Sequence, residues 1–161
     1  MASYSFATFW AVEAPLDAVW EALLASEQWP VWWPYLEAVV QVSPGAPDGI
    51  GAIHRFSWRG PLPYRLIFEM VATRIERPCV LAGTARGDLE GTGQWTLAPG
   101  GNGTTCVRYD WNVRTTRTWM NLLAPVARRL FAWNHNLVMK AGGEGLSRHL
   151  GRGGSLPVLS G

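Results

Sequence analysis

Two side chains, His54 and Tyr109, have the chemistry needed to move a proton inside this protein. His54 stands in a segment of alternating apolar residues and shares one strand face with Phe56 and Trp58. Burial can shift the pKa of an imidazole, which makes His54 a candidate acid or base, and a buried, hydrogen-bonded structural histidine is the alternative. The Tyr109 hydroxyl could orient a ligand carbonyl. Asp110 points to the opposite strand face and is not a candidate.

Other signals for chemistry are weak. The three histidines stand at positions 54, 135 and 149, without the paired spacing of a metal site. We therefore expect no metal ion and no cofactor. The glycines at 91 and 93 fall in a strand pair, and those at 100–103 fall in a hairpin, so neither group predicts a phosphate-binding loop. No Ser/His/Asp or Cys/His arrangement can be argued from the sequence.

Asn134 is a polar exception on an otherwise apolar helix face that also carries Phe131. An unpaired amide in the interior costs about 1–3 kcal/mol, so Asn134 needs partners. It either bonds a polar group or water within the core, or it faces a cavity and contacts a ligand. His135 lies at the edge of this face, and we interpret it as a boundary residue rather than a catalyst.

Hydrophobic periodicity defines the elements that position these groups. Residues 4–12 predict a strand, Pro15 opens a helix, and two prolines limit residues 28–33 to a short helical turn. The period then changes to two, which predicts strands at 36–42, 52–59, 64–75, 80–85 and 89–97, and a last strand through 107–113. From 117 to 149 the period of 3.6 returns, which predicts one long helix kinked at Pro125. This order predicts an α+β fold in which the helix covers one face of an antiparallel sheet.

The period-two pattern turns a set of mostly aromatic side chains toward the C-terminal helix. Such a lining suits a small-molecule pocket, because apolar area gives affinity and sparse polar groups give orientation. A solid aromatic core is the alternative. With His54 at the same face, the candidate ligand-binding residues are Phe56, Trp58, Leu66, Phe68, Met70, Trp95, Tyr109, Trp111, Phe131 and Asn134.

Composition narrows the class of protein. The 161 residues suit one domain, and 48% are hydrophobic while only 16% are charged. The net charge is +2 and no long basic run occurs, which argues against nucleic-acid binding. The two cysteines, Cys79 and Cys106, are expected to be reduced and buried. Without a signal-peptide pattern or a transmembrane run, a cytoplasmic location is expected.

A modest basic cluster precedes and begins the predicted C-terminal helix. A transient contact of this cluster with an anionic membrane during ligand exchange is one interpretation, and a solvated helix face is the other. Its members are Arg114, Arg117, Arg128 and Arg129.

Several segments resemble the START-like (SRPBCC) superfamily of polyketide cyclase/dehydrase and lipid transport proteins. They are APLDAVWEALLASEQWPVWWP, GDLEGTGQWTL, GTTCVRYDWNV and NHNLVMKAGGEGL, and the resemblance spans about residues 4–150. It implies a helix-grip fold, in which a curved antiparallel sheet wraps around a long C-terminal helix, with two short helices after the first strand. It also implies a START-like ligand-binding domain over residues 1–150. The small, glycine-rich residues 151–161 predict a flexible tail.

The resemblance implies a cavity between the sheet and the helix that holds a lipid- or polyketide-like molecule. Binding or transport of a hydrophobic ligand is favoured, because catalytic groups are sparse and apolar lining is abundant. The alternative is a polyketide cyclase or dehydratase, a lyase- or isomerase-type enzyme that uses His54 or Tyr109. A third hypothesis is an interaction module that acts through an exposed Trp32–Trp33 surface. The sequence fixes neither the ligand nor the oligomeric state.

Overall fold

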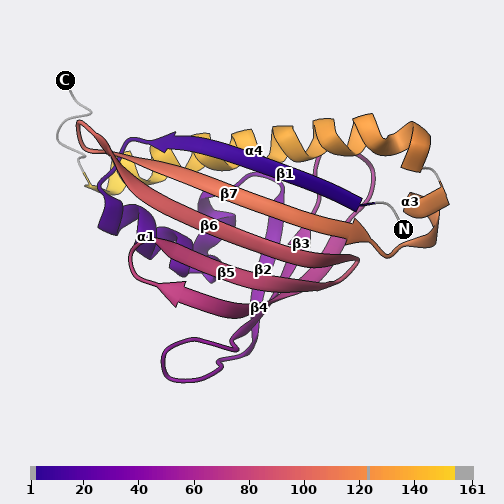
Figure 1. Ribbon diagram of the computed structural model, residues 1–161. Coiled ribbons are helices and arrows are strands. Elements are labelled where there is room, and N and C mark those ends of the chain that lie inside the picture. The colour runs from indigo at the N-terminus through magenta and orange to yellow at the C-terminus, as the bar shows by residue number, and fades with distance from the viewer. Residues whose placement is uncertain (1–2, 123, 155–161) are drawn as a thin grey trace.

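The computed structural model describes residues 3–122 and 124–154 as one sheet with helices on one side (Figure 1). Its elements in chain order are β1 (Ser3–Val12), α1 (Leu16–Leu24), the 3₁₀ turn η1 (Ser26–Gln28), α2 (Trp29–Trp32), β2 (Leu36–Ser43), β3 (Ile53–Trp58), β4 (Leu66–Glu76), β5 (Val80–Gly87), β6 (Leu89–Gly101), β7 (Thr104–Thr115), α3 (Thr118–Leu122) and α4 (Ala124–Gly154).

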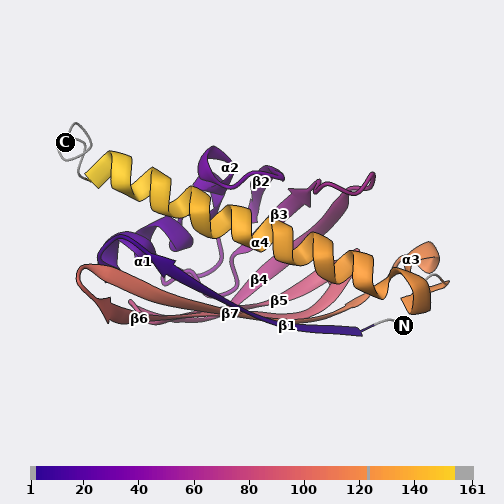
Figure 2. The same ribbon diagram turned by 90° about the horizontal axis from the view of Figure 1, so that it is seen from above.

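The seven strands form one antiparallel sheet in the order β1-β7-β6-β5-β4-β3-β2. Six strands follow one another as a meander, and β1 pairs with β7 to complete the sheet. The long helix α4 lies across the concave face, as the view from above shows (Figure 2). This is the predicted α+β helix-grip fold, and the two short helices after the first strand are present as α1 and α2.

The helices α1 and α2 bury their apolar side chains in the core of the protein. Pro15 occupies the N-cap position of α1 in an extended conformation, and α1 buries Val19, Trp20 and Leu23. Trp32 and Trp33 are only 6% and 2% exposed. The hypothesis of an exposed Trp32–Trp33 interaction surface is therefore wrong, because these indoles form part of the core.

The structure describes the C-terminal region as α3 and α4, on either side of residue 123, which lies outside the described residues. Pro125 is the second residue of the described α4, and the predicted kink at this position stays a prediction. The helix α4 continues through Gly142 and Gly143 to Gly154. The predicted tail is thus helical as far as Gly154, and residues 155–161 lie outside the described residues.

Both cysteines are exposed and free, which corrects the prediction that they are buried. Cys79 follows the end of β4, before β5 begins, and Cys106 lies on the outer face of β7, opposite Ala98 in the ladder. The alternation along β7 explains the second error, because Thr105 and Val107 occupy the buried face beside it. Among the described residues, no helix is long and apolar enough to cross a membrane.

Candidate ligand-binding cavity

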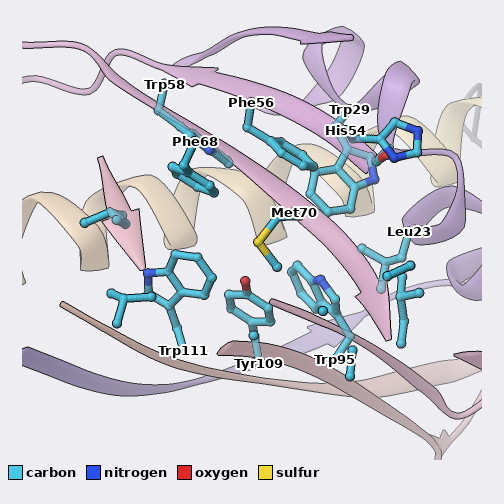
Figure 3. Close-up of a pocket in the computed structure, with 18 of the residues that line it drawn as sticks. Leu23, Trp29, His54, Phe56, Trp58, Phe68, Met70, Trp95, Tyr109 and Trp111 are labelled. Atoms are coloured by element: carbon cyan, nitrogen blue, oxygen red, sulfur yellow. The ribbon is translucent and has the colours of Figure 1, made fainter. Parts of the chain in front are cut away.

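A cavity of about 590 Å³ lies between the concave face of the sheet and α4 (Figure 3). This volume falls within the range of small-molecule pockets, so the aromatic residues do not fill the interior completely. The structure places every candidate from the sequence on its wall, and whether they bind a ligand stays a prediction. These wall residues are His54, Phe56, Trp58, Leu66, Phe68, Met70, Trp95, Tyr109, Trp111, Phe131 and Asn134.

One wall of the cavity is a stack of three rings from β6 and β7. The Tyr109 ring lies 4.1 Å from Trp95 and 5.7 Å from Trp111 between centroids, and both pairs are stacked. Gly93 leaves room for this stack, because a Cβ there would lie 2.6 Å from the Tyr109 hydroxyl oxygen. The stack presents a flat, aromatic surface to the cavity.

A second group of rings, from β3, β4 and α2, lies across the cavity from this stack. Phe56 and Phe68 are stacked at 6.0 Å, and Trp29 lies 5.5 Å from Phe56. The two groups approach each other at Phe68 and Trp111, 5.6 Å apart, and at Trp29 and Trp95, 5.9 Å apart. Between these groups lies a slot, with Met70 projecting into it (Figure 3).

The Tyr109 hydroxyl points into the cavity (Figure 3). Burial raises the pKa of this phenol well above its ordinary value of 10. The group is therefore neutral at physiological pH and can donate a hydrogen bond, but it cannot act as a phenolate base.

His54 lies at the opposite end of the cavity from α3, where the wall reaches the surface. Its Nε2 is 3.7 Å from Glu27 Oε1, which is longer than a hydrogen bond, and its side chain is 21% exposed. Exposed residues from the segment between β2 and β3 and from the β4–β5 turn, such as Asp48 and Arg77, complete this end of the wall. We call this end the mouth of the cavity.

His135, which the sequence predicts at the edge of the apolar face, is half-buried and also lines the cavity. Its ring stacks on Phe6 with centroids 4.0 Å apart. Burial lowers the pKa of the imidazole to about 4, so the ring is neutral at pH 7. A helical projection centred on Phe131 and Leu146 would have found it, since these two buried residues flank its direction.

Asn134 lies on the cavity wall, and whether it contacts a ligand stays a prediction. Its side chain lies over Gly60, where an added Cβ would be 2.6 Å from Oδ1. This oxygen is buried and has no hydrogen-bond partner among the described residues.

The helices after β1 contribute wall residues that the sequence analysis missed. Their apolar faces were predicted to be buried, but the sequence carries no signal that they face the cavity rather than solid core. The missed residues include Leu23, Trp29 and Trp33, together with Tyr4 and Phe6 from β1 and Val138 and Met139 from α4.

The arginines of the predicted basic cluster are mostly engaged with the sheet. Arg114 pairs with Glu90, and Arg117 pairs with Asp88. Arg128 donates a hydrogen bond to the Ser3 carbonyl oxygen. In the part of the chain that the structure describes, no group of His, Cys, Asp and Glu side chains could hold a metal ion.

The helix-grip fold and its cavity define a START-like protein. The chain belongs to the polyketide cyclase/dehydrase and lipid transport family, whose model matches residues 5–151. No curated protein matches it in sequence.

Solved structures with the same fold have very different sequences. The Zhui aromatase/cyclase from Streptomyces sp. R1128 has a TM-score of 0.77 at 15% identity, covering 94% of this chain and 95% of its own. A START superfamily protein from Mycobacterium smegmatis has a TM-score of 0.74 at 12% identity, covering 92% and 97%. A norcoclaurine synthase from Thalictrum flavum has a TM-score of 0.56 at 12% identity, covering 86% and 96%. At these identities the similarity shows the fold alone.

Proposed function

We propose that this protein binds a small hydrophobic ligand, with rings or a lipid-like body, in the cavity between the sheet and α4. The observation that carries the proposal is a cavity of about 590 Å³ walled mainly by aromatic and aliphatic side chains. Each 100 Å² of apolar ligand surface buried there contributes roughly 2.5 kcal/mol before the costs of association. Membership of a family described by lipid transport and polyketide chemistry supports the same class of ligand.

Cyclisation or dehydration of a polyketide-type substrate is the second candidate, favoured by the family and by the aromatase/cyclase with the same fold. Tyr109 would donate a hydrogen bond to a substrate carbonyl oxygen, because its raised pKa keeps the phenol protonated. His54, beside Glu27 at the mouth, would be the base. Turnover that survived the double replacement of His54→Ala and Tyr109→Phe would remove both residues from such a mechanism.

The proposed binding is tested by filling the cavity from one wall. Ala72 lines the cavity on β4, and Ala72→Phe would place a phenyl ring in the space of the ligand. We expect affinity for 1-methylpyrene, measured by fluorescence titration, to fall at least about tenfold. Ala98→Phe is the matched control, because Ala98 is exposed on the outer face of β6 and should leave the affinity unchanged.

Native mass spectrometry and solvent extraction of the purified protein complete this test. The proposal fails if the wild-type protein neither retains nor binds any apolar compound. It also fails if Ala72→Phe and Ala98→Phe, both folded by thermal melting, bind the probe as tightly as the wild type.

A further inference from the structure

Polar side chains from three segments line the cavity around Phe6 and Phe131, toward the end of β3 that is farther from His54. Asn134 and His135 come from α4, Tyr4 from β1, and Tyr64 from the segment before β4, and all four line the cavity. Phe6 links two of them, since it stacks on Tyr4 at 6.0 Å and on His135 at 4.0 Å. We call these four residues the inner polar cluster.

A second aromatic residue, Phe131, ties the tyrosines of the cluster together. Its ring lies 5.9 Å from the ring of Tyr4 and 5.9 Å from that of Tyr64. Asn134 lies on the same part of α4, where its side chain reaches Gly60. The inner polar cluster is therefore one local site rather than four scattered groups.

Three atoms of this cluster are buried without a hydrogen-bond partner among the described residues: Tyr4 Oη, Asn134 Oδ1 and His135 Nε2. The other two such atoms in the described chain, Nε1 of Trp10 and of Trp20, do not belong to the wall of this cavity. Buried polar groups in proteins nearly always have partners, so a concentration of unpaired ones on the wall of a cavity needs an explanation. A polar group on a ligand in this cavity would supply the partner.

The inner polar cluster carries no charge at neutral pH. Burial lowers the pKa of His135 to about 4 and raises that of Tyr64 to about 12. Burial also raises the pKa of Tyr4, against the opposing effect of Arg128. Together with the Asn134 amide, these neutral groups offer both hydrogen-bond donors and acceptors.

The nearby arginines favour a negative charge at the two tyrosines less than burial disfavours it. Arg128 is exposed, lies over the ring of Tyr4 and donates to the Ser3 carbonyl, and Arg117 is paired with Asp88. The charged side chains on the described cavity wall, Glu27, Asp48 and Arg77, are at the mouth. A carboxylate or phosphate at the inner end would lose its hydration without gaining a buried counter-ion among the described residues.

We propose that the inner polar cluster anchors an uncharged hydroxyl or carbonyl group at one end of an otherwise apolar ligand, and that it excludes an anionic group there. Asn134 and His135 are the central residues of this anchor, and Tyr4 and Tyr64 complete it. This inference rests on the proposed function, since it assigns the chemical class and the orientation of the ligand in the same cavity.

Three fluorescent probes that share one apolar body test the anchor: 1-pyrenemethanol, 1-methylpyrene and 1-pyrenecarboxylate. Titrated into the wild-type protein at pH 7.5, the alcohol should bind roughly fivefold more tightly than the methyl compound, in proportion to one net hydrogen bond. Without an anchor the order reverses, because burying the hydroxyl then costs desolvation. The carboxylate should bind at least about tenfold more weakly than the alcohol.

Substitutions on α4 test whether Asn134 and His135 are the residues that bind the hydroxyl group of 1-pyrenemethanol. Asn134→Leu should lower the affinity for 1-pyrenemethanol to that for 1-methylpyrene and leave the latter within about twofold. His135→Phe, which keeps a ring against Phe6, should act in the same direction. Asn136→Leu is the matched control, because Asn136 is exposed on the same helix, and it should change no affinity.

The outcomes separate this inference from the proposed function. If 1-methylpyrene binds the wild type but 1-pyrenemethanol binds no more tightly, or the carboxylate binds as well as the alcohol, the anchor is wrong and ligand binding stands. If none of the three probes binds, both proposals fail. Since the ranking of the probes is measured on wild-type protein, it decides the question even if Asn134→Leu does not fold.

Discussion

His135 is an imidazole enclosed by apolar groups on the inner side of α4. Its ring stacks on Phe6, its Nε2 is buried without a partner among the described residues, and its pKa falls to about 4 because burial disfavours the charged form. A folded pKa below the ordinary 6.5 means that protons bind the unfolded chain more readily. Stability from this group is therefore complete above pH 6.5 and is lost as the pH falls toward 4.

This linkage gives a measurable pH dependence. Between pH 7.5 and 5.5 the free energy of unfolding should decrease by about 1 kcal/mol through His135 alone. Urea denaturation of the wild type and of His135→Phe measures it, and the variant should lose this part of the slope. His149→Gln, at an exposed position of α4, is the control and should keep it. Equal slopes for the wild type and His135→Phe would show that His135 is not buried as a neutral ring.

The face of the sheet toward which a side chain points was predictable wherever the alternation along a strand determines it. Phe56, Phe68 and Trp95 follow the period of two, and the structure places all three on the inner face. Exposed Cys106 was mispredicted because a small, apolar residue type was weighed above the alternation that places it outside. Where pattern and residue type disagree on a strand, the pattern was the better guide in this sequence.

At the scale of elements, α4 packs on α2 through residues that have no side chain. A Cβ at Gly142 would lie 2.3 Å from the Trp33 ring, and one at Gly145 would lie 1.8 Å from the Trp32 carbonyl oxygen. This close approach lets the Trp33 indole donate a 2.9 Å hydrogen bond to the Val138 carbonyl oxygen. The contact fixes α4 over the cavity.

Gly142→Ala should therefore destabilise the protein, although alanine favours helices. Overpacking against a 2%-exposed indole should cost about 1–3 kcal/mol, measured by thermal or urea unfolding. Gly151→Ala on the same helix is the matched comparison, since no described atom lies within 4 Å of its added Cβ. That substitution should stabilise the protein by about 0.5–1 kcal/mol. A stabilising Gly142→Ala would mean that α4 and α2 are farther apart than the structure has them.

The inner face of α4 was only partly predictable for the same reason. A helical period of 3.6 puts Leu130 on the same broad apolar face as Phe131, yet the Leu130 side chain is 52% exposed. The buried side includes Gly142 and Gly145, which have no side chain to add to a hydrophobic pattern, and the polar His135 lines the cavity. Where a helix packs through glycines and a neutral histidine, the side of the helix with the most apolar residues differs from the side that is buried.

At the scale of the whole molecule, the order of periods along the chain was enough to predict an antiparallel sheet with one face covered by the C-terminal helix. The resemblance to the START-like superfamily added that this sheet curves around the helix and leaves a cavity. The volume of the cavity was not predictable, because it is a small difference between the space under a curved sheet and the volume of many rings. The contribution of α1 and α2 to its wall depends on tertiary packing that no local pattern carries.

A cavity of about 590 Å³ in a 161-residue domain also predicts how the whole protein responds to its ligand. The rings that line it lack contacts on one side, so the ligand-free fold forgoes part of their packing energy. A ligand that binds only the folded state at a concentration of 100 Kd stabilises it by about 2.7 kcal/mol. For a domain of this size, Tm should rise by roughly 5–10 °C when 1-methylpyrene is added in calorimetry, and Ala72→Phe should show a much smaller rise at the same probe concentration. A wild-type Tm that stays constant while fluorescence reports saturation would place the probe outside the cavity, on a surface that the unfolded chain also offers.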